Sequence, residues 1–182
     1  MCNEFRFEDS LADLIDAFSQ LEMPLTWAGG APNLEPRASI RPTDPAYILT
    51  GQEGAANLSQ LRWGFPGPRG PIINFRSEGR GFAKGRCLVP ASAFFEFTGP
   101  KAPKSKWEFT PADGGFLAIA GLIRDDRFTL LTCAPGPDIA PYHDRQIVIL
   151  PRAHWTQWLD ATQPAPPIGP LPGGSLRVGQ VR

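Results

Sequence analysis

The chain has 182 residues and 42% apolar content, which suits one globular domain and excludes an intrinsically disordered segment. No stretch approaches the roughly 20 apolar residues of a membrane span, and the N-terminus lacks the pattern of a signal peptide. The 18 basic and 18 acidic residues cancel, so net charge alone indicates no class of partner. We therefore expect a cytoplasmic protein, and nothing in the sequence indicates more than a monomer.

The first predicted element is a helix over residues 10–21. Its apolar residues recur at the i, i+3, i+4, i+7 spacing of an amphipathic helix. Ser10 with Asp13 three residues later resembles a capping box. A second helix is predicted to begin at Pro151, a residue favoured in the first helical turn, and to run to Leu159.

Between the helices, the chain is divided by Pro and Gly, which together make up 40 of the 182 residues. Short apolar and β-branched runs between these breaks predict strands at Tyr47–Thr50, Ile72–Asn74, Cys87–Val89, Ala93–Phe97, Trp107–Phe109, Phe116–Ile123, Phe128–Cys133 and Ile147–Leu150. This pattern indicates an α+β, mostly β fold with a barrel-like antiparallel sheet core and a few peripheral helices.

The C-terminal part begins with a Pro- and Gly-rich connection over residues 161–174, ATQPAPPIGPLPGG. A composition of this kind interrupts regular secondary structure. The segment SLRVGQVR that follows is predicted to be a short final strand. We find no internal repeat, so residues 1–182 are expected to form a single domain.

Positive charge is concentrated in the middle of the chain. Residues 62–106 carry a net charge of +7, whereas residues 1–61 carry −6. A local basic surface attracts an anionic partner such as a phosphate backbone. Basic loops that only keep a protein in solution give the same pattern, so charge leaves both interpretations open.

The three cysteines, Cys2, Cys87 and Cys133, are odd in number and show no CxxC spacing. This argues against a disulfide framework and against a zinc site. Cys2 directly follows Met1, and removal of Met1 would leave an α-amine and a thiol on one residue. Most cysteines at this position have no function, so the other motifs must show whether Cys2 is a functional residue.

Two strand segments place polar residues in apolar surroundings. In IINFRSEGR, Asn74 follows an apolar run and Arg76 lies on the same side of a period-two strand. In RCLVPASAFFEF, Glu96 stands among phenylalanines, so its carboxylate is expected to be paired, to have a raised pKa, or both. A structural ion pair with a nearby arginine would explain Glu96 equally well.

Two further segments carry candidate residues. His143, in PYHDRQIVIL, precedes a strand and is either a functional or a structural histidine. In RWGFPGPRG, Trp63 and Phe65 stand beside arginines, a combination that stacks on unpaired bases and binds phosphates, unless Trp63 belongs to the core. With one well-placed histidine and scattered acids, we expect no metal ion.

The chain resembles the SOS response-associated peptidase (SRAP) family, whose members cross-link to abasic sites in single-stranded DNA. The resemblance is carried, in order, by Cys2, NFRSE at 74–78, RCLVPASAFFEF at 86–97, AGL at 120–122 and HDRQIVIL at 143–150. It implies a single SRAP-like domain with single-stranded DNA as its partner.

The resemblance also implies roles for the matching residues. Cys2, after loss of Met1, matches the family's nucleophile, and Asn74 matches an asparagine beside it. Glu96 matches the catalytic acid, and His143 matches the active-site histidine. Residues at DNA-contacting positions are Arg76, Arg145, Trp63, Gly64, Phe65, Arg41 and Pro42.

The implied reaction is a cross-link that shields the lesion in the DNA damage response. The amine of Cys2 adds to the aldehyde of an abasic site to give an imine, and the thiol closes a five-membered thiazolidine. Glu96 is expected to move protons, and no cofactor is required. The family usually begins Cys-Gly-Arg-Phe, so Asn3 and Glu4 are departures. A negative charge at Glu4 predicts weaker or differently shaped DNA engagement.

Three other functions stay open. A thiol autopeptidase would use Cys2, Glu96 and His143 as nucleophile, proton carrier and oxyanion support, and a lyase activity belongs to the same site. A catalytically silent single-stranded DNA-binding domain would form no bond. An N-terminal-nucleophile amidotransferase also begins with Cys, but its glutamine-binding motifs are missing from the sequence.

Overall fold

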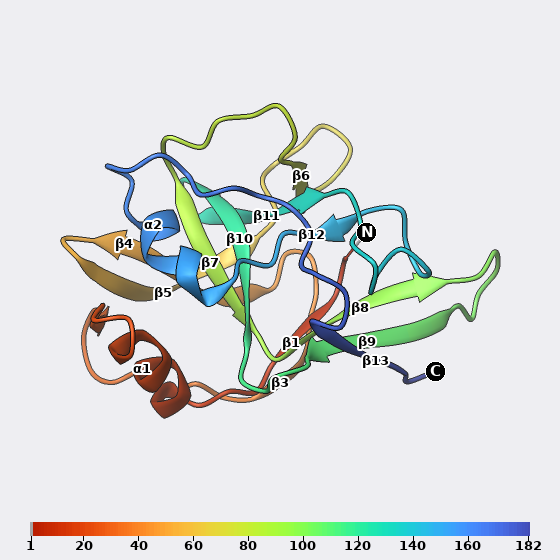
Figure 1. Ribbon diagram of the computed structural model, residues 1–182, viewed down its shortest axis with the longest axis horizontal. Helices are drawn as coiled ribbons and strands as arrows, with labels where there is room; N and C mark the ends of the chain where they lie inside the picture. The colour runs from red at the N-terminus through yellow and green to blue at the C-terminus, as the bar shows by residue number, and fades with distance from the viewer. Residues whose placement is uncertain (1) are drawn as a thin grey trace.

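The computed structural model describes residues 2–182, which form two sheets with short helices packed against them (Figure 1). The strands are β1 (Phe5–Phe7), β2 (Leu25–Trp27), β3 (Arg37–Ile40), β4 (Pro45–Gln52), β5 (Ala55–Trp63), β6 (Asn74–Arg76), β7 (Arg86–Ala91), β8 (Ala93–Thr98), β9 (Ser105–Pro111), β10 (Leu117–Arg124), β11 (Arg127–Cys133), β12 (Gln146–Ile147) and β13 (Leu176–Gln180). The helices are α1 (Leu11–Ser19), the 3₁₀ helix η1 (Arg152–His154) and α2 (Trp155–Leu159). No helix among the described residues is long and apolar enough to cross a membrane.

One sheet has the strand order β13-β9-β8-β1-β3, and the other has the order β12-β11-β10-β7-β4-β5-β2 with β6 beside β11. Because β11 also pairs with β5, the strands β11, β10, β7, β4 and β5 close into a ring. The mostly β fold predicted from the sequence is confirmed. The ring closes through a parallel pair, Phe128 beside Trp63, whereas the sequence predicts an antiparallel core.

Helix α1 forms where the sequence predicts it. Ser10 caps the helix, and the Ser10 and Asp13 side chains and backbones bond reciprocally as a capping box. The buried face packs Leu14 and Phe18 into the core. The helix ends at Ser19 rather than at residue 21, because the chain turns through a left-handed conformation at Glu22, with φ of 54°.

The second predicted helix is shorter than expected. Pro151 precedes a 3₁₀ turn, and α-helical geometry begins only at Trp155. Two indole N–H groups fix this segment, since Trp155 donates to the Leu150 carbonyl at 2.9 Å and Trp158 donates to the Cys87 carbonyl at 2.8 Å. Helix α2 is therefore anchored on β7, whose six residues are all buried.

Several strands of the structure are not predicted from the sequence. The sequence does not predict the strands β1, β2, β3 and β5. For β5, which spans nine residues, the reason is its composition: AANLSQLRW contains no β-branched residue and only one aromatic residue. Strand β6 begins at Asn74, whereas the sequence places a strand over residues 72–74. The predicted final strand is present as β13, which follows an irregular segment over residues 161–174 and pairs with β9.

Candidate active site

Cys2 lies just before β1 and has only 1% of its surface exposed. Strand β1 is held by β8, where Phe5 pairs with Phe94, and by β3. The Cys2 thiol donates to the Glu4 carbonyl at 3.4 Å, and the Phe95 backbone N–H donates to the same oxygen at 3.0 Å. Burial, and then the charge of Glu96, raise the pKa of the Cys2 thiol well above its ordinary value. At neutral pH, Cys2 is therefore a neutral thiol.

Asn74 connects Cys2 to the second sheet. It opens β6, which runs parallel to β11 with Asn74 beside Leu130. Its side-chain amide donates to the Cys2 carbonyl at 2.9 Å. The Asn74 Oδ1 atom is buried and has no hydrogen-bond partner among residues 2–182. This oxygen is available to accept a hydrogen bond from a donor that enters the site.

Glu96 extends from β8 into the core, and 1% of its surface is exposed. Burial raises the pKa of Glu96 to about 7, and the negative charge of Asp144 acts in the same direction. The carboxyl group therefore exchanges a proton near neutral pH, as a general acid and base must. The raised pKa that the sequence suggested for Glu96 agrees with its environment.

His143 precedes β12 in a turn. Its Nδ1 atom lies 3.0 Å from the Arg145 backbone N–H and 2.8 Å from an oxygen of Asp144. Burial lowers the pKa of His143, which favours the neutral ring. Nδ1 faces a donor, the Arg145 backbone N–H, and an acceptor, the Asp144 carboxylate, so a bare Nδ1 accepts from Arg145 and a protonated Nδ1 donates to Asp144.

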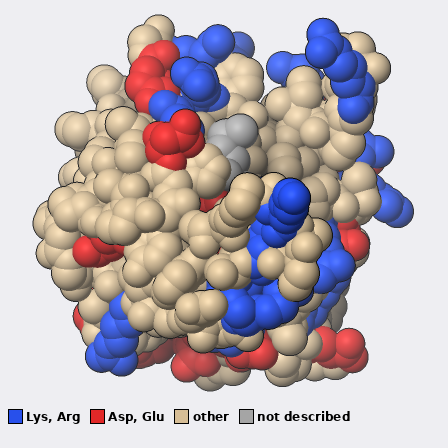
Figure 2. Space-filling view, turned by 90° about the vertical axis from the view of Figure 1, so that its right-hand side faces the viewer, with Lys and Arg blue, Asp and Glu red and all other residues tan. Residues whose placement is uncertain are grey.

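The candidate DNA-binding arginines differ in their surroundings. Arg145 makes a bidentate ion pair with Glu78 and also donates to Thr132 Oγ1 at 3.0 Å. Hydrogen bonding to Arg145 lowers the pKa of Glu78 to about 2, so both groups stay charged. Arg76 is exposed on β6, two residues after Asn74. Figure 2 shows several Lys and Arg side chains on one face, with acidic side chains among them.

The aromatic residues of the RWGF segment lie inside the protein. Trp63 is fully buried, its Nε1 donates to the Ile73 carbonyl at 3.0 Å, and its ring packs 5.1 Å from the Phe5 ring. Phe65 is 3% exposed. Trp63 is therefore a core residue, the alternative left open by the sequence, and it supports β1, the strand that follows Cys2. Gly64 has φ of 111°, a conformation that favours glycine.

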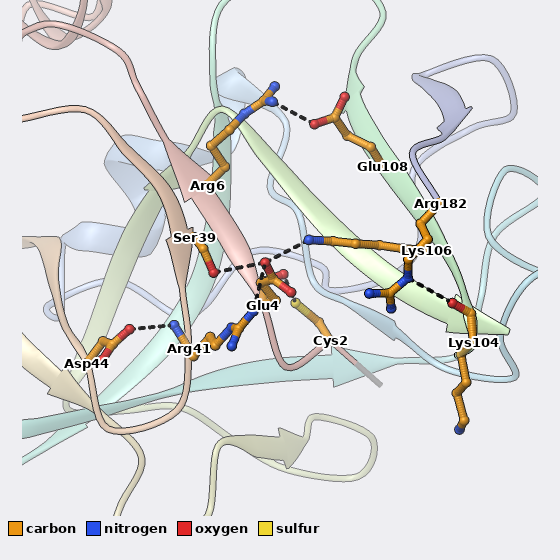
Figure 3. A network of polar contacts seen from close by, with 10 residues as sticks. All are labelled: Cys2, Glu4, Arg6, Ser39, Arg41, Asp44, Lys104, Lys106, Glu108 and Arg182. Carbon is orange, nitrogen blue, oxygen red and sulfur yellow. Dashed lines mark hydrogen bonds and ion pairs between the residues drawn. The ribbon is translucent and has the colours of Figure 1, made fainter. Parts of the chain in front are cut away.

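Glu4, a departure from the family pattern, is buried and paired rather than directed at solvent (Figure 3). Its carboxylate accepts hydrogen bonds from Ser39 Oγ at 2.9 Å and from Lys106 Nζ at 2.7 Å. Burial favours the neutral acid, but these bonds outweigh it and lower the pKa of Glu4. Arg41 approaches the same oxygen at 4.0 Å, and Pro42, next to it, is half-buried.

The structure thus brings Cys2, Asn74 and Glu96 together at the junction of the two sheets. His143 contacts Asp144, whose negative charge helps to raise the pKa of Glu96. Lys106 and Ser39 also belong to this region, and the sequence predicted for neither of them a contact with Glu4. The excess of lysines in residues 101–106 was the only signal for Lys106, because its partner Glu4 is 102 residues away. Residues 2–182 contain no group of three or more His, Cys, Asp or Glu side chains placed to hold a metal ion.

Comparison with known proteins identifies related chains and folds. A curated relative, the abasic site processing protein YoaM of Bacillus subtilis (strain 168), is 24% identical over 91% of this chain and 82% of its own length. A crystal structure from Bordetella bronchiseptica shares the fold with a TM-score of 0.74 at 22% identity, covering 100% of both chains. One from Bacteroides thetaiotaomicron has a TM-score of 0.71 at 14% identity, covering 100% of this chain and 92% of that one.

The family model described as SOS response associated peptidase (SRAP) matches residues 1–171. This match spans nearly all of the 182 residues, including every candidate active-site residue. The chain belongs to the SRAP family.

Proposed function

We propose that this chain processes abasic sites in single-stranded DNA by forming a covalent thiazolidine with Cys2 after removal of Met1. The observation that carries the proposal is the placement of Cys2, whose carbonyl is bound by Asn74 and whose thiol lies within the electrostatic reach of Glu96. The curated relative named for abasic site processing supports the substrate class. We place the activity in the reducing cytoplasm, where Cys2 stays a thiol, and expect the chain to act as a monomer.

The first step uses the α-amine of Cys2. The neutral amine adds to the aldehyde carbon of the ring-opened abasic site, and the resulting carbinolamine loses its hydroxyl as water. A proton from Glu96, whose pKa of about 7 leaves a large fraction protonated, promotes this loss. The Asn74 Oδ1 atom is a suitable acceptor for an N–H of the amine. The product of this step is a protonated imine.

The second step uses the thiol. Sulfur adds to the imine carbon, a C–S bond forms, and the thiol proton passes to the Glu96 carboxylate that the first step left ionised. The electron pair of the imine returns to nitrogen, which completes the five-membered ring. The balance is one aldehyde and one Cys2 giving one thiazolidine and one water, so no oxidant or reductant is needed.

The protonation state of Cys2 favours this reaction over thiol peptidase chemistry. A thiol peptidase needs a thiolate, and thiolates form where the pKa is lowered by positive charge. Burial and Glu96 raise the pKa of Cys2 instead. In the thiazolidine route the amine attacks first, and the thiol then meets a strongly electrophilic iminium carbon, so a preformed thiolate is not required.

The test is a denaturing gel shift with a single-stranded oligonucleotide that carries one abasic site. Protein whose Met1 loss has been checked by mass is expected to give a heat-stable band. Cys2→Ala keeps the amine but lacks the thiol, so it should give a band only after borohydride reduction. Glu96→Gln should slow cross-linking by about 100-fold or more, and Asn74→Ala by about tenfold.

The oligonucleotide without the abasic site is the matched control for substrate, and Ser19→Ala is the matched control for the variants because Ser19 is exposed on α1. A correctly processed protein that gives no band would overturn the proposal. A heat-stable band in Cys2→Ala without reduction would overturn the thiazolidine, because it would show that a stable adduct forms without the thiol.

A further inference from the structure

Two cations and one anion meet beside Cys2 (Figure 3). Lys106 Nζ bonds the Glu4 carboxylate at 2.7 Å, and Arg41 lies 4.0 Å from the same oxygen. The side chain of Glu4 is 6% exposed, that of Lys106 is 19% exposed and that of Arg41 is 69% exposed. The anion is therefore hidden while the cations reach the surface, and their charges leave an excess of +1.

The position of Lys106 is fixed from two sides. Besides its bond to Glu4, its ammonium group lies 3.8 Å from the centre of the Phe95 ring, a cation–π contact. Phe95 precedes Glu96, and its backbone N–H donates to the Glu4 carbonyl that also accepts from the Cys2 thiol. The ammonium group is thus held by the same residues that position Cys2.

We propose that Lys106 and Arg41, held by Glu4, form an anion-binding site for the DNA phosphate that flanks the reacting abasic nucleotide. The inference rests on the proposed function and deepens it by naming the contact nearest the nucleophile. Phosphate oxygens accept from ammonium and guanidinium groups, and they can reach the exposed Arg41 and the partly exposed Lys106 without contacting the shielded carboxylate. Glu4 acts as a counter-ion that orients both cations and limits their net charge.

An anion-binding site and a simple structural ion pair predict different effects of Glu4 substitution on DNA affinity. Neutralising Glu4 leaves both cations uncompensated, so DNA binding should tighten. Neutralising Lys106 leaves the buried carboxylate against the DNA path, so binding should weaken. A structural ion pair remote from DNA would change stability in both variants and change affinity in neither.

The test measures non-covalent binding of an undamaged single-stranded oligonucleotide by fluorescence anisotropy between about 50 and 200 mM NaCl. Lys106→Gln should weaken binding by about threefold to tenfold and reduce the salt slope by about 0.7, the value for one phosphate contact on a single strand. Glu4→Gln should tighten binding by a similar factor and steepen the slope.

Charge-matched variants provide the controls. Glu53→Gln and Lys84→Gln make the same changes of charge at exposed positions for which no ion pair is present among the described residues. The anion site would be overturned if each site variant bound DNA as tightly as its control, that is, if Glu4→Gln equalled Glu53→Gln and Lys106→Gln equalled Lys84→Gln. So would a wild-type protein that binds no oligonucleotide at about 50 mM NaCl.

Folding is controlled by the double variant Glu4→Gln/Lys106→Gln. It replaces the buried pair with two neutral amides, so it should fold even where Lys106→Gln alone is destabilised. Its affinity should be weaker than that of Glu4→Gln, and an affinity equal to that of Glu4→Gln would overturn the role of Lys106. Because the oligonucleotide carries no abasic site, a failure of cross-linking leaves these results intact, and a failure of this site leaves cross-linking intact.

Discussion

Glu96 makes the stability of the protein depend on pH. Burial raises the pKa of Glu96 from 4.5 to about 7, so between these values the folded protein binds more protons than the unfolded chain. The contribution of Glu96 to the free energy of unfolding is therefore fully present below pH 4.5 and is lost as the pH rises through 7. We expect Glu96→Gln to remove this decline, which amounts to about 3 kcal/mol at most.

Urea unfolding of both proteins across this pH range measures the effect. The neutral amide of the variant cannot ionise, so its free energy of unfolding should change less than that of the wild type. A wild-type decline that persists unchanged in Glu96→Gln would show that another group controls it. The same variant connects stability to the reaction, because the carboxyl group that destabilises the folded state is the proposed proton carrier.

Trp63 supports the site from the core rather than from the DNA interface. Trp63→Phe removes the bond from Nε1 to the Ile73 carbonyl and is expected to lower the free energy of unfolding by about 1–2 kcal/mol. Since the indole is fully buried, affinity of the folded protein for undamaged single-stranded DNA should change by less than about twofold. Thermal unfolding and anisotropy check the two parts, and a large loss of affinity in a folded variant would restore the stacking role.

The candidate site was predictable where a residue matches a motif and unpredictable where its contact is distant in sequence. Cys2, Asn74 and Glu96 were recognised from their motifs, and the structure brings them together. The pairing of Glu4 with Lys106 and with Ser39 joins residues 102 and 35 positions apart. No local pattern encodes such a pairing, so the sequence suggested a charge facing DNA where the structure has an ion pair.

At the scale of elements, α2 packs closely on β4 at Gly51. A Cβ atom at Gly51 would lie 2.0 Å from the Leu159 carbonyl oxygen, a distance that requires the helix to move. We expect Gly51→Ala to lower the free energy of unfolding by about 2 kcal/mol or more. Gly179→Ala is the matched control because it also lies in a strand and its Cβ meets no atom within 4 Å. Equal unfolding midpoints for the two variants would contradict the close approach.

A helix or strand could be predicted where a single segment contains both its apolar period and its end signals. Helix α1 has both its apolar period and its Ser10 cap within ten residues, so its start was correctly placed. Strand β5 has neither a strict alternation nor β-branched residues, and it is stabilised by its neighbours β4, β2 and β11. The parallel contact between β5 and β11 also depends on the whole fold, so no local pattern could predict it.

For the whole molecule, the closed ring predicts an order of local stability. Strands β7 and β10 pair over six residues inside the ring, and all of β7 is buried. Residues 99–104, between β8 and β9, are all exposed. In native-state hydrogen exchange we expect the amides of Cys87, Leu88 and Val89 in β7 to exchange only by global unfolding. The amides of Lys101, Ala102 and Lys104 are expected to exchange fastest. Comparable protection in the two segments would contradict this order.

The burial of Cys2 also depends on how far synthesis of the chain has proceeded. Strand β1 is enclosed by β8, at residues 93–98, so the start of the chain stays accessible on the ribosome until about half of the polypeptide has emerged. Until β8 has paired, the Cys2 thiol is in contact with solvent and with any oxidant dissolved in it. The translation rate over the first 98 codons therefore helps to set how long this thiol stays exposed before the fold encloses it.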